Sequence, residues 1–162
     1  MNKNFLQIEN VTFTAGDKSK VNNLSLNIEN EGDIICLLGP SGIGKTTILR
    51  TIAGLERIKS GKIILKKKII SSNKIHVEPE NRNISLSFQD NCLFPHYNVI
   101  QNIEFGAAQN KKKTKNLDVN EVIKFLNLDH IKDKFPHQIS SGEAQRASLA
   151  RSLLSKPDLL LL

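Results

Sequence analysis

The sequence has few aromatic residues, two cysteines and no long apolar run, and each shortage excludes a class of protein. Aromatic residues make up 5% of the chain, with no Trp and one Tyr. Cys36 and Cys92 lie in unrelated contexts without metal-ligand partners at usable spacing, which indicates reduced thiols rather than a disulfide framework or a zinc site. No apolar run approaches the ~18 residues of a membrane span, and residues 1–7 lack the apolar stretch of a signal peptide. We therefore expect a soluble, intracellular chain.

The positive charge of the chain comes mainly from lysine. The 162 residues carry 23 Lys and Arg against 16 Asp and Glu, a formal net charge of +7. Two lysine runs, Lys66–Lys68 and Lys111–Lys113, lie between periodic segments and lack interleaved aromatic residues. Such runs are typical of solvated loops and do not favour nucleic-acid binding. A polyphosphate is the anionic partner that the motifs below support.

Hydrophobic periodicity predicts an α/β chain. Leu24, Leu26 and Ile28 alternate with polar residues, as in a half-buried strand, whereas Asp33–Leu38 is a continuous apolar run typical of a strand buried on both faces. A helix over Thr46–Ala53 is expected to end at Gly54. Further strands are expected at Gly61–Leu65, Ile69–Ile70, Asn83–Phe88 and Leu159–Leu162, and further helices at Asn98–Phe105, Val119–Leu126 and Ser141–Leu154.

Residues 39–47 form a glycine-rich stretch, GPSGIGKTT, between the expected buried strand and the first helix. The stretch matches G-x-x-x-x-G-K-[ST], in which glycines let backbone N–H groups approach a phosphate and the helix N-terminus adds its dipole. Lys45 would reach the β- and γ-phosphates, and the Thr46 hydroxyl would ligate Mg²⁺. The motif predicts a nucleoside-triphosphate binder. Its candidate nucleotide-binding residues are Gly39, Pro40, Ser41, Gly42, Ile43, Gly44, Lys45, Thr46 and Thr47.

Three later segments narrow this prediction. Residues 87–90 read SFQD after an expected strand, residues 93–103 read LFPHYNVIQNI, and residues 139–153 read ISSGEAQRASLARSL. Following a P-loop in this order, they resemble the Q-loop, the LFPH-x-x-V-x-x-N-I stretch and the signature of the ATP-binding subunits of ABC transporters, in particular of bacterial importers. The resemblance runs nearly end to end.

The resemblance implies a P-loop NTPase (RecA-like) core of the ABC ATPase type, with an antiparallel β subdomain and a helical subdomain, C-terminally truncated. ATP and Mg²⁺ are the implied cofactors. Gln89 would contact Mg²⁺ and the attacking water, and would act with Lys45 in catalysis. Residues Phe94–Asn102 would meet the transmembrane permease. A second copy of the subunit, arranged head to tail, would meet the γ-phosphate with its signature residues, which are Ser140, Ser141, Gly142 and Glu143.

Two positions depart from the family pattern. Ser141 stands where the family has its first signature glycine, which adds a side chain where backbone would meet phosphate. Ala15 stands where the family places an aromatic residue that stacks on adenine. Either Phe13, two residues earlier, stacks on the base or the stacking is lost.

The C-terminal segment Pro157–Leu162 resembles the run-up to the Walker B strand. In the family an Asp that supports Mg²⁺ and a Glu that acts as general base follow at once. We therefore interpret the 162 residues as an N-terminal part of a longer subunit. We expect a nucleotide-binding core with the β subdomain over about residues 1–90, the helical subdomain over about 91–154, and the start of the Walker B strand at 157–162.

The resemblance predicts the energy-coupling ATPase of a solute importer, peripheral on the cytoplasmic side of the cell inner membrane. A periplasmic or extracellular solute-binding protein would be an indirect partner. Residues 77–106 are similar to the subgroup serving ferric iron, with polyamine, sulfate and molybdate importers close behind. Two alternatives remain open, a non-transport ABC-type ATPase and a nucleotide-binding regulatory protein. About a hundred residues separate Gly39 from Ser140 without heptads, unlike the coiled coil of a DNA-repair ATPase.

The 162 residues are expected to bind ATP but to hydrolyse it hardly at all, because the family's Walker B Asp and catalytic Glu lie beyond Leu162. Steady-state phosphate release should rise strongly in a chain that continues through those two acids. Equal turnover by the two chains would contradict this expectation.

Overall fold

The chain folds into two compact units, Met1–Arg82 and Asn83–Leu162, each with its own apolar core. The computed structural model describes residues 4–15, 19–87, 93–109 and 118–162. Within those ranges, no helix is both long and apolar enough to cross a bilayer. The subdivision expected near residue 90 concerns functional subdomains of the family and stays a prediction.

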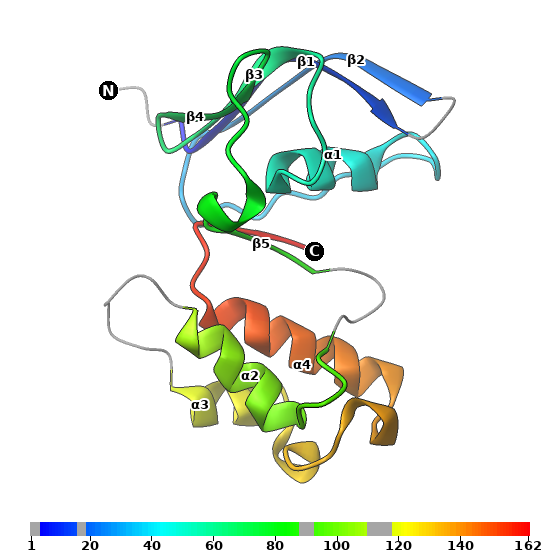
Figure 1. The fold of residues 1–162 in the computed structure, drawn as a ribbon, viewed down its shortest axis with the longest axis vertical. Helices are drawn as coiled ribbons and strands as arrows, with labels where there is room; N and C mark the ends of the chain where they lie inside the picture. Colours follow the sequence, from blue (N-terminus) through cyan, green and yellow to red (C-terminus); the bar gives the residue numbers. More distant parts are fainter. Residues whose placement is uncertain (1–3, 16–18, 88–92, 110–117) are drawn as a thin grey trace. The chain divides into compact units, whose positions relative to one another are not determined.

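The first unit is built on a four-stranded antiparallel sheet with the strand order β2-β1-β3-β4 (Figure 1). Leu6 in the inner strand β1 lies opposite Ile28 in β2 and Leu65 in β3. Lys66 and Lys67 join β3 to β4 with φ angles of 47° and 68°, the two positive values that a type I′ hairpin turn needs. The expected strand pair around a lysine turn is confirmed. The strands are β1 (Leu6–Ala15), β2 (Ser19–Ile28), β3 (Ser60–Leu65) and β4 (Lys68–Ser72).

A register shift in β1 decides which of its side chains are buried. Leu6 and Ile8 are buried before the shift, and Val11 and Phe13 are buried after it. The shift falls between Ile8 and Val11, and Asn10 within it has a φ of 49°. An extra residue in one strand reverses the alternation that a regular strand would keep. The buried set therefore changes from even to odd positions part-way along β1.

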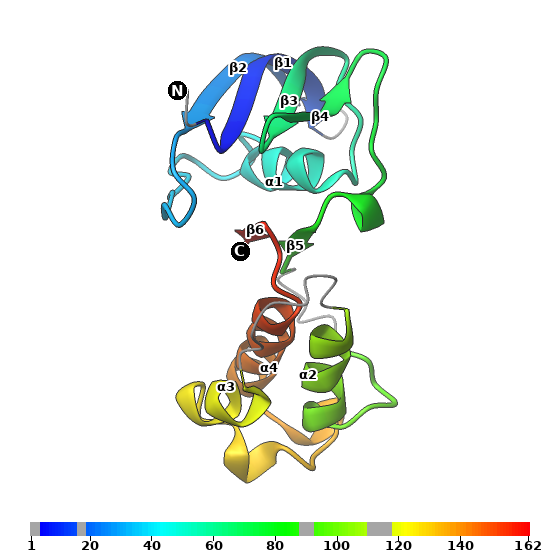
Figure 2. The same cartoon turned by 90° about the vertical axis from the view of Figure 1, so that its left-hand side faces the viewer.

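Helix α1 (Lys45–Ala53) lies along one face of this sheet (Figures 1 and 2). Its last turn is buried through Thr51, Ile52 and Ala53. Gly54 then adopts a left-handed conformation, with φ 94°, and its N–H bonds back to the final turn. Only a residue without Cβ adopts this conformation at no steric cost, so the helix ends where the sequence predicts.

The segment of residues 33–38 is not a strand, so the prediction of a strand buried on both faces is wrong for this structure. Residues 33–40 form no ladder with any described residue. Ile34 is 97% exposed and Leu38 is 87% exposed. An apolar run becomes a buried strand only when hydrogen-bonded neighbours and covering layers are supplied by other parts of a sheet. The local composition therefore indicates a tendency to form a strand, but it does not supply the pairing strands that a strand needs.

In the part that the structure describes, the second unit combines a short parallel strand pair with three α-helices. Ile84 in β5 (Ile84–Leu86) lies opposite Leu159 in β6 (Leu159–Leu161). Figure 2 shows α2 (Val99–Ala108) beside α4 (Ser141–Leu154), with α3 (Val119–Phe125) next to them. All the elements expected in this unit are present, with ends shifted by a few residues. Single 3₁₀ turns cover Pro79–Asn81 in the first unit and Asp129–Ile131 and Pro136–Gln138 in the second. The core of the second unit consists of Val99, Ile103, Val122, Ile123, Leu128, Ile131, Ala147, Ala150 and Leu154.

Helices α2 and α4 approach each other closely at Gly106. A Cβ placed on this glycine would overlap the carbonyl oxygen of Arg151. Gly106 is buried within α2. A side chain here would force the two helices apart, because neither backbone can yield in a packed core.

Replacing Gly106 by alanine should lower the free energy of unfolding by about 1–3 kcal/mol, the usual effect of overpacking. Gly142→Ala is the matched control, because a Cβ at this second helical glycine would meet only Arg146, 3.8 Å away. Alanine is the better helix former, so the control should be neutral or slightly stabilising. Urea denaturation measures both, and equal effects would contradict the packing described.

Candidate functional site

The glycine-rich loop before α1 has the positive φ angles that are typical of a phosphate-binding loop. Gly42 and Gly44 have φ angles of +82° and +100°, where side chains are strained. Gly44 is the N-cap of α1, so no side chain bonds the first N–H groups of the helix, and its first turn holds no acidic residue. A Cβ at Gly42 would meet nothing within 4 Å. The loop therefore leaves a helix N-terminus, the positive end of its dipole, open to an anion.

Lys45 lies across this loop. Its Nζ donates to the carbonyl oxygens of Gly39, at 2.6 Å, and Pro40, at 2.8 Å. The ammonium is thus held beside the helix N-terminus by two neutral acceptors. A phosphate oxygen is a stronger acceptor for a cation than a carbonyl, so the same ammonium could turn to a bound phosphate.

The other side chains of the loop differ in solvent exposure. Ser41, Ile43 and Thr46 are exposed, and Thr47 is partly buried. The Thr47 carbonyl accepts from the Thr51 hydroxyl at 2.7 Å, which is a bond along the helix. The Thr46 hydroxyl is an oxygen donor of the kind Mg²⁺ accepts. Within the described part of the chain, no group of three His, Cys, Asp or Glu side chains could hold a metal ion.

The predicted signature residues gather at the N-terminus of α4. Ser140 is the N-cap, and its hydroxyl accepts from the Glu143 N–H at 3.3 Å. In return, the Glu143 carboxylate accepts from the Ser140 N–H at 2.8 Å and from its hydroxyl at 2.7 Å. This reciprocal capping box fixes the start of the helix. Ser140, Ser141 and Gly142 are all exposed, so this helix end can meet a partner surface.

Glu143 also has a histidine neighbour. The Nε2 of His130 lies 3.0 Å from the second carboxylate oxygen of Glu143. Hydrogen bonds from the Ser140 backbone and hydroxyl, followed by the contact with His130, lower the pKa of Glu143 from 4.5 to about 2. The N-terminus of α4 therefore presents a carboxylate that stays ionised over the whole neutral and mildly acidic range.

The segment before α2 is held by Asn102, which is fully buried. Its Oδ1 accepts from the Phe94 N–H at 2.8 Å and from the Arg151 guanidinium at 3.3 Å. Its Nδ2 donates to the carbonyls of Phe94, Tyr97 and Asn98 at 3.0–3.2 Å. One amide thus ties the loop to α2 and, through Arg151, to α4. The predicted permease-facing segment has a fixed shape.

Aromatic rings cluster on this segment. The Phe94 ring makes an edge contact with Phe105, with centroids 4.8 Å apart, and lies 5.7 Å from the Tyr97 ring. His96 packs beside Tyr97 at 4.5 Å. The rings thus pack against one another along this segment.

One predicted site residue is wrongly assigned. Phe13 is 1% exposed and packs in the core of the first unit, so its ring cannot stack on adenine. The bulge in β1 turns this position inward. The side chain of Ala15 and the whole of Gln89 lie outside the described residues, and the prediction for Gln89 stays open.

Sequence reasoning did not assign the packing role of two buried polar residues, Asn102 and Arg82. Asn102 was detectable, because it interrupts the apolar stripe that Val99, Ile103 and Gly106 form on α2. Arg82 gave no local signal, since its hydrogen-bond partners lie 5 to 31 residues away in the sequence.

A sequence profile of the ABC transporter family matches residues 21–162. The chain belongs to the ABC transporter family. It is 41% identical, over 159 residues, to the Fe(3+) ions import ATP-binding protein FbpC of Fusobacterium nucleatum, covering 97% of this chain and 42% of that protein. It is 38% identical, over 163 residues, to the spermidine/putrescine import ATP-binding protein PotA of Pasteurella multocida, covering 99% of this chain and 43% of that protein. The chain thus spans less than half the length of these relatives.

Solved structures confirm the ABC ATPase cassette fold. A dimeric, post-hydrolysis state of the ATP-binding cassette MJ0796 bound to ADP and Pi matches with a TM-score of 0.75 and 26% identity, over 96% of this chain and 72% of that chain. The cbiO1 protein from Clostridium perfringens, part of the ABC transporter complex cbiONQ, matches with a TM-score of 0.74 and 26% identity, over 98% of this chain and 64% of that chain. The family resemblance drawn from the motifs is confirmed.

The depressed pKa of Glu143 predicts an acid-sensitive start of α4. A carboxylate whose pKa is lower in the folded than in the unfolded chain stabilises the fold above about pH 4.5 and loses that effect as the pH falls toward 2. Glu143→Gln removes the titrating group, so the difference in unfolding free energy between wild type and variant should shrink across this window. Urea denaturation at several pH values measures it, and a pH-independent difference would argue against the bonds described.

Proposed function

We propose that this chain is part of the ATP-binding subunit of an ABC importer, which couples ATP binding and hydrolysis to the uptake of a solute across the cytoplasmic membrane. The observation that carries the proposal is the loop before α1. It combines an uncapped helix N-terminus, two glycines with positive φ and the Lys45 ammonium held beside them. Family membership supports ATP as the ligand of this loop.

In this proposal the residues of the loop bind the phosphates of ATP. The N–H groups at the start of α1 donate to phosphate oxygens, and Lys45 exchanges its two carbonyl acceptors for the β- and γ-phosphates. The Thr46 hydroxyl and Gln89 would hold Mg²⁺, which would neutralise phosphate charge in the bound state. Gln89 would also orient the attacking water. The site chemistry is thus charge neutralisation and positioning.

A second copy of the subunit would complete the site. The exposed end of α4, with Ser140, Ser141 and Gly142, would meet the γ-phosphate bound by the partner. The dimeric cassette bound to ADP and Pi supports this arrangement as a property of a relative. The Ser140 hydroxyl would then exchange its bond to Glu143 for a phosphate oxygen. Ser141 would limit how closely backbone and phosphate approach.

The permease would dock on Phe94–Asn102, whose aromatic rings and Asn102-fixed backbone give a defined surface. The subunit would lie peripherally on the cytoplasmic side of the inner membrane, linked indirectly to a solute-binding protein.

Ferric iron is the first substrate candidate, because the relative named for Fe(3+) import is 41% identical, against 38% for a relative named for spermidine/putrescine import. The permease and binding protein, rather than this subunit, would select the solute. The import names of these relatives favour transport over a non-transport ATPase.

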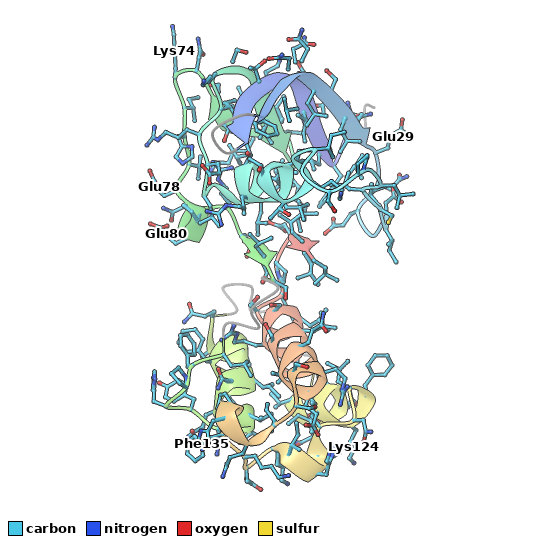
Figure 3. All side chains as sticks on the ribbon, turned by 90° about the vertical axis from the view of Figure 1, so that its right-hand side faces the viewer. Glu29, Lys74, Glu78, Glu80, Lys124 and Phe135 are labelled. Carbon is cyan, nitrogen blue, oxygen red and sulfur yellow. The ribbon has the colours of Figure 1, made fainter. Side chains whose placement is uncertain are left out.

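Lys45→Ala should weaken Mg-ATP binding by roughly tenfold or more, because a charge-assisted hydrogen bond to phosphate contributes about 1.5–3 kcal/mol. Lys74→Ala is the matched control, since it removes the same charge from an exposed residue of the same unit (Figure 3). Titration calorimetry measures both, and the control should bind as the wild type does. Equal affinities for the two variants would refute the assignment of the loop.

A further inference from the structure

Arg82 is the one charged side chain that is buried among the described residues, with 3% of its surface exposed. It lies just before β5, after the 3₁₀ turn of Pro79–Asn81. Burial lowers the pKa of Arg82 from 12.5 to about 10, and nearby Glu78 acts in the opposite direction. The guanidinium therefore remains charged at neutral pH inside the first unit.

The guanidinium of Arg82 converges on the end of the P-loop helix. Its Nη1 donates to the carbonyl oxygens of Thr51, at 3.1 Å, and Ile52, at 2.9 Å, which belong to the last turn of α1. The Gly54 N–H caps the same turn, and the Leu55 N–H bonds the Arg50 carbonyl at 2.9 Å. The carbonyls that a helix normally leaves without partners at its C-terminus are thus satisfied from two sides.

The remaining donors of Arg82 reach β4 and the segment that follows it. Its Nε donates to the Val77 carbonyl at 2.7 Å, and its Nη2 donates to the Ser71 hydroxyl at 2.8 Å and lies 3.4 Å from His76 Nδ1. His76 in turn contacts the Gly54 carbonyl through its other ring nitrogen, at 3.1 Å. One side chain therefore joins α1 to β4 and to the segment that follows β4.

The site is shaped for this one side chain. A Cβ at Gly54 would overlap Arg82 Nε, so the glycine that ends α1 also makes room for the guanidinium. Glu78 and Glu80 project outward at the edge of the unit (Figure 3) and are exposed. The acceptors of the cation include three backbone carbonyls and the Ser71 hydroxyl, and two of the carbonyls lie at the negative end of the helix dipole.

A buried cation is costly to desolvate, and an apolar side chain of similar size would often stabilise a core as well. What an apolar residue cannot do is bind two helix carbonyls, a strand hydroxyl and a loop carbonyl in fixed directions. Helix α1 has nine residues and is about 13 Å long, short enough to move as a rigid rod. A tilt at its C-terminus would displace Lys45 and Gly44 at its N-terminus.

We propose that Arg82 is a positioning residue for phosphate binding: by fixing the C-terminus of α1 against β4 and Val77, it sets where the N-terminus of α1 and Lys45 meet the phosphates. The proposal rests on the proposed function of the loop as the ATP site. Arg82 touches no phosphate itself and acts only through α1.

The test compares Arg82→Gln with variants of equal stability. Gln keeps part of the polarity but cannot reach all five partners. Core variants in β1, such as Ile8→Val and Val11→Ala, lower stability without removing a hydrogen bond from the end of α1. The one that matches Arg82→Gln in urea denaturation is the control. Mg-ATP affinity is measured at a temperature where all variants are folded. Arg82→Gln should bind about tenfold more weakly than its matched control. Equal affinities would overturn the proposal.

A second variant tests the proposal if Arg82→Gln does not fold, and a measurement without nucleotide tests it if the wild type binds no Mg-ATP. If Arg82→Gln does not fold, Ser71→Ala removes one acceptor of the guanidinium and should weaken Mg-ATP binding more than a β1 variant of equal stability does. Backbone amide chemical shifts of Gly42 and Gly44 are recorded without nucleotide for every variant. They should move in the Arg82 or Ser71 variant and not in the control, and unmoved shifts would overturn the proposal. A wild type that binds no Mg-ATP would refute the proposed function, whereas these shifts would still test Arg82.

Discussion

The loop before α1 can attract an anion because the two ends of α1 differ: the backbone carbonyls at its C-terminus are hydrogen-bonded, whereas the N–H groups at its N-terminus have no side-chain cap. At its C-terminus, Gly54 and the buried guanidinium of Arg82 take up the carbonyls of the last turn. At its N-terminus, the cap is a glycine, no acidic side chain competes in the first turn, and Lys45 bonds to the carbonyls of Gly39 and Pro40. A helix that is fully satisfied at both ends would not attract an anion. The asymmetry leaves its positive end available to phosphate.

The helices of the second unit follow the opposite pattern. α2 begins with Asn98 and Gln101 in a reciprocal capping box, and α4 begins with Ser140 and Glu143 in another. These N-termini are satisfied by their own side chains, so a phosphate that approached α4 would compete with an existing bond between Ser140 and Glu143. Such an end suits a contact that forms and breaks, whereas the open end of α1 suits retained binding. This difference fits a nucleotide held by one subunit and met by a second.

The parts that the sequence predicts are those with local causes. The glycine-lysine loop, the stop at Gly54 and the N-cap Ser140 each depend on neighbours within a few residues, and all appear where expected. The parts that it does not predict depend on distant neighbours. Residues 33–38 have the composition of a buried strand, but a strand exists only with pairing partners. The sequence offers Phe13 as a ring for adenine stacking, but the bulge in β1 turns its side chain into the core. The role of Arg82 could not be recognised from the sequence, because its acceptors come from α1 and β4.

The most direct test is to map Mg-ATP onto the chain by amide chemical shifts of the ¹⁵N-labelled protein. Phosphate binding by the open end of α1 predicts that the largest changes fall in residues 39–47, with Gly42, Gly44 and Lys45 among them. Changes at Ser140 and Glu143 should stay small at protein concentrations too low for two copies to associate. Saturating Mg-ATP that leaves residues 39–47 unchanged, or that shifts another region more strongly, would contradict the account.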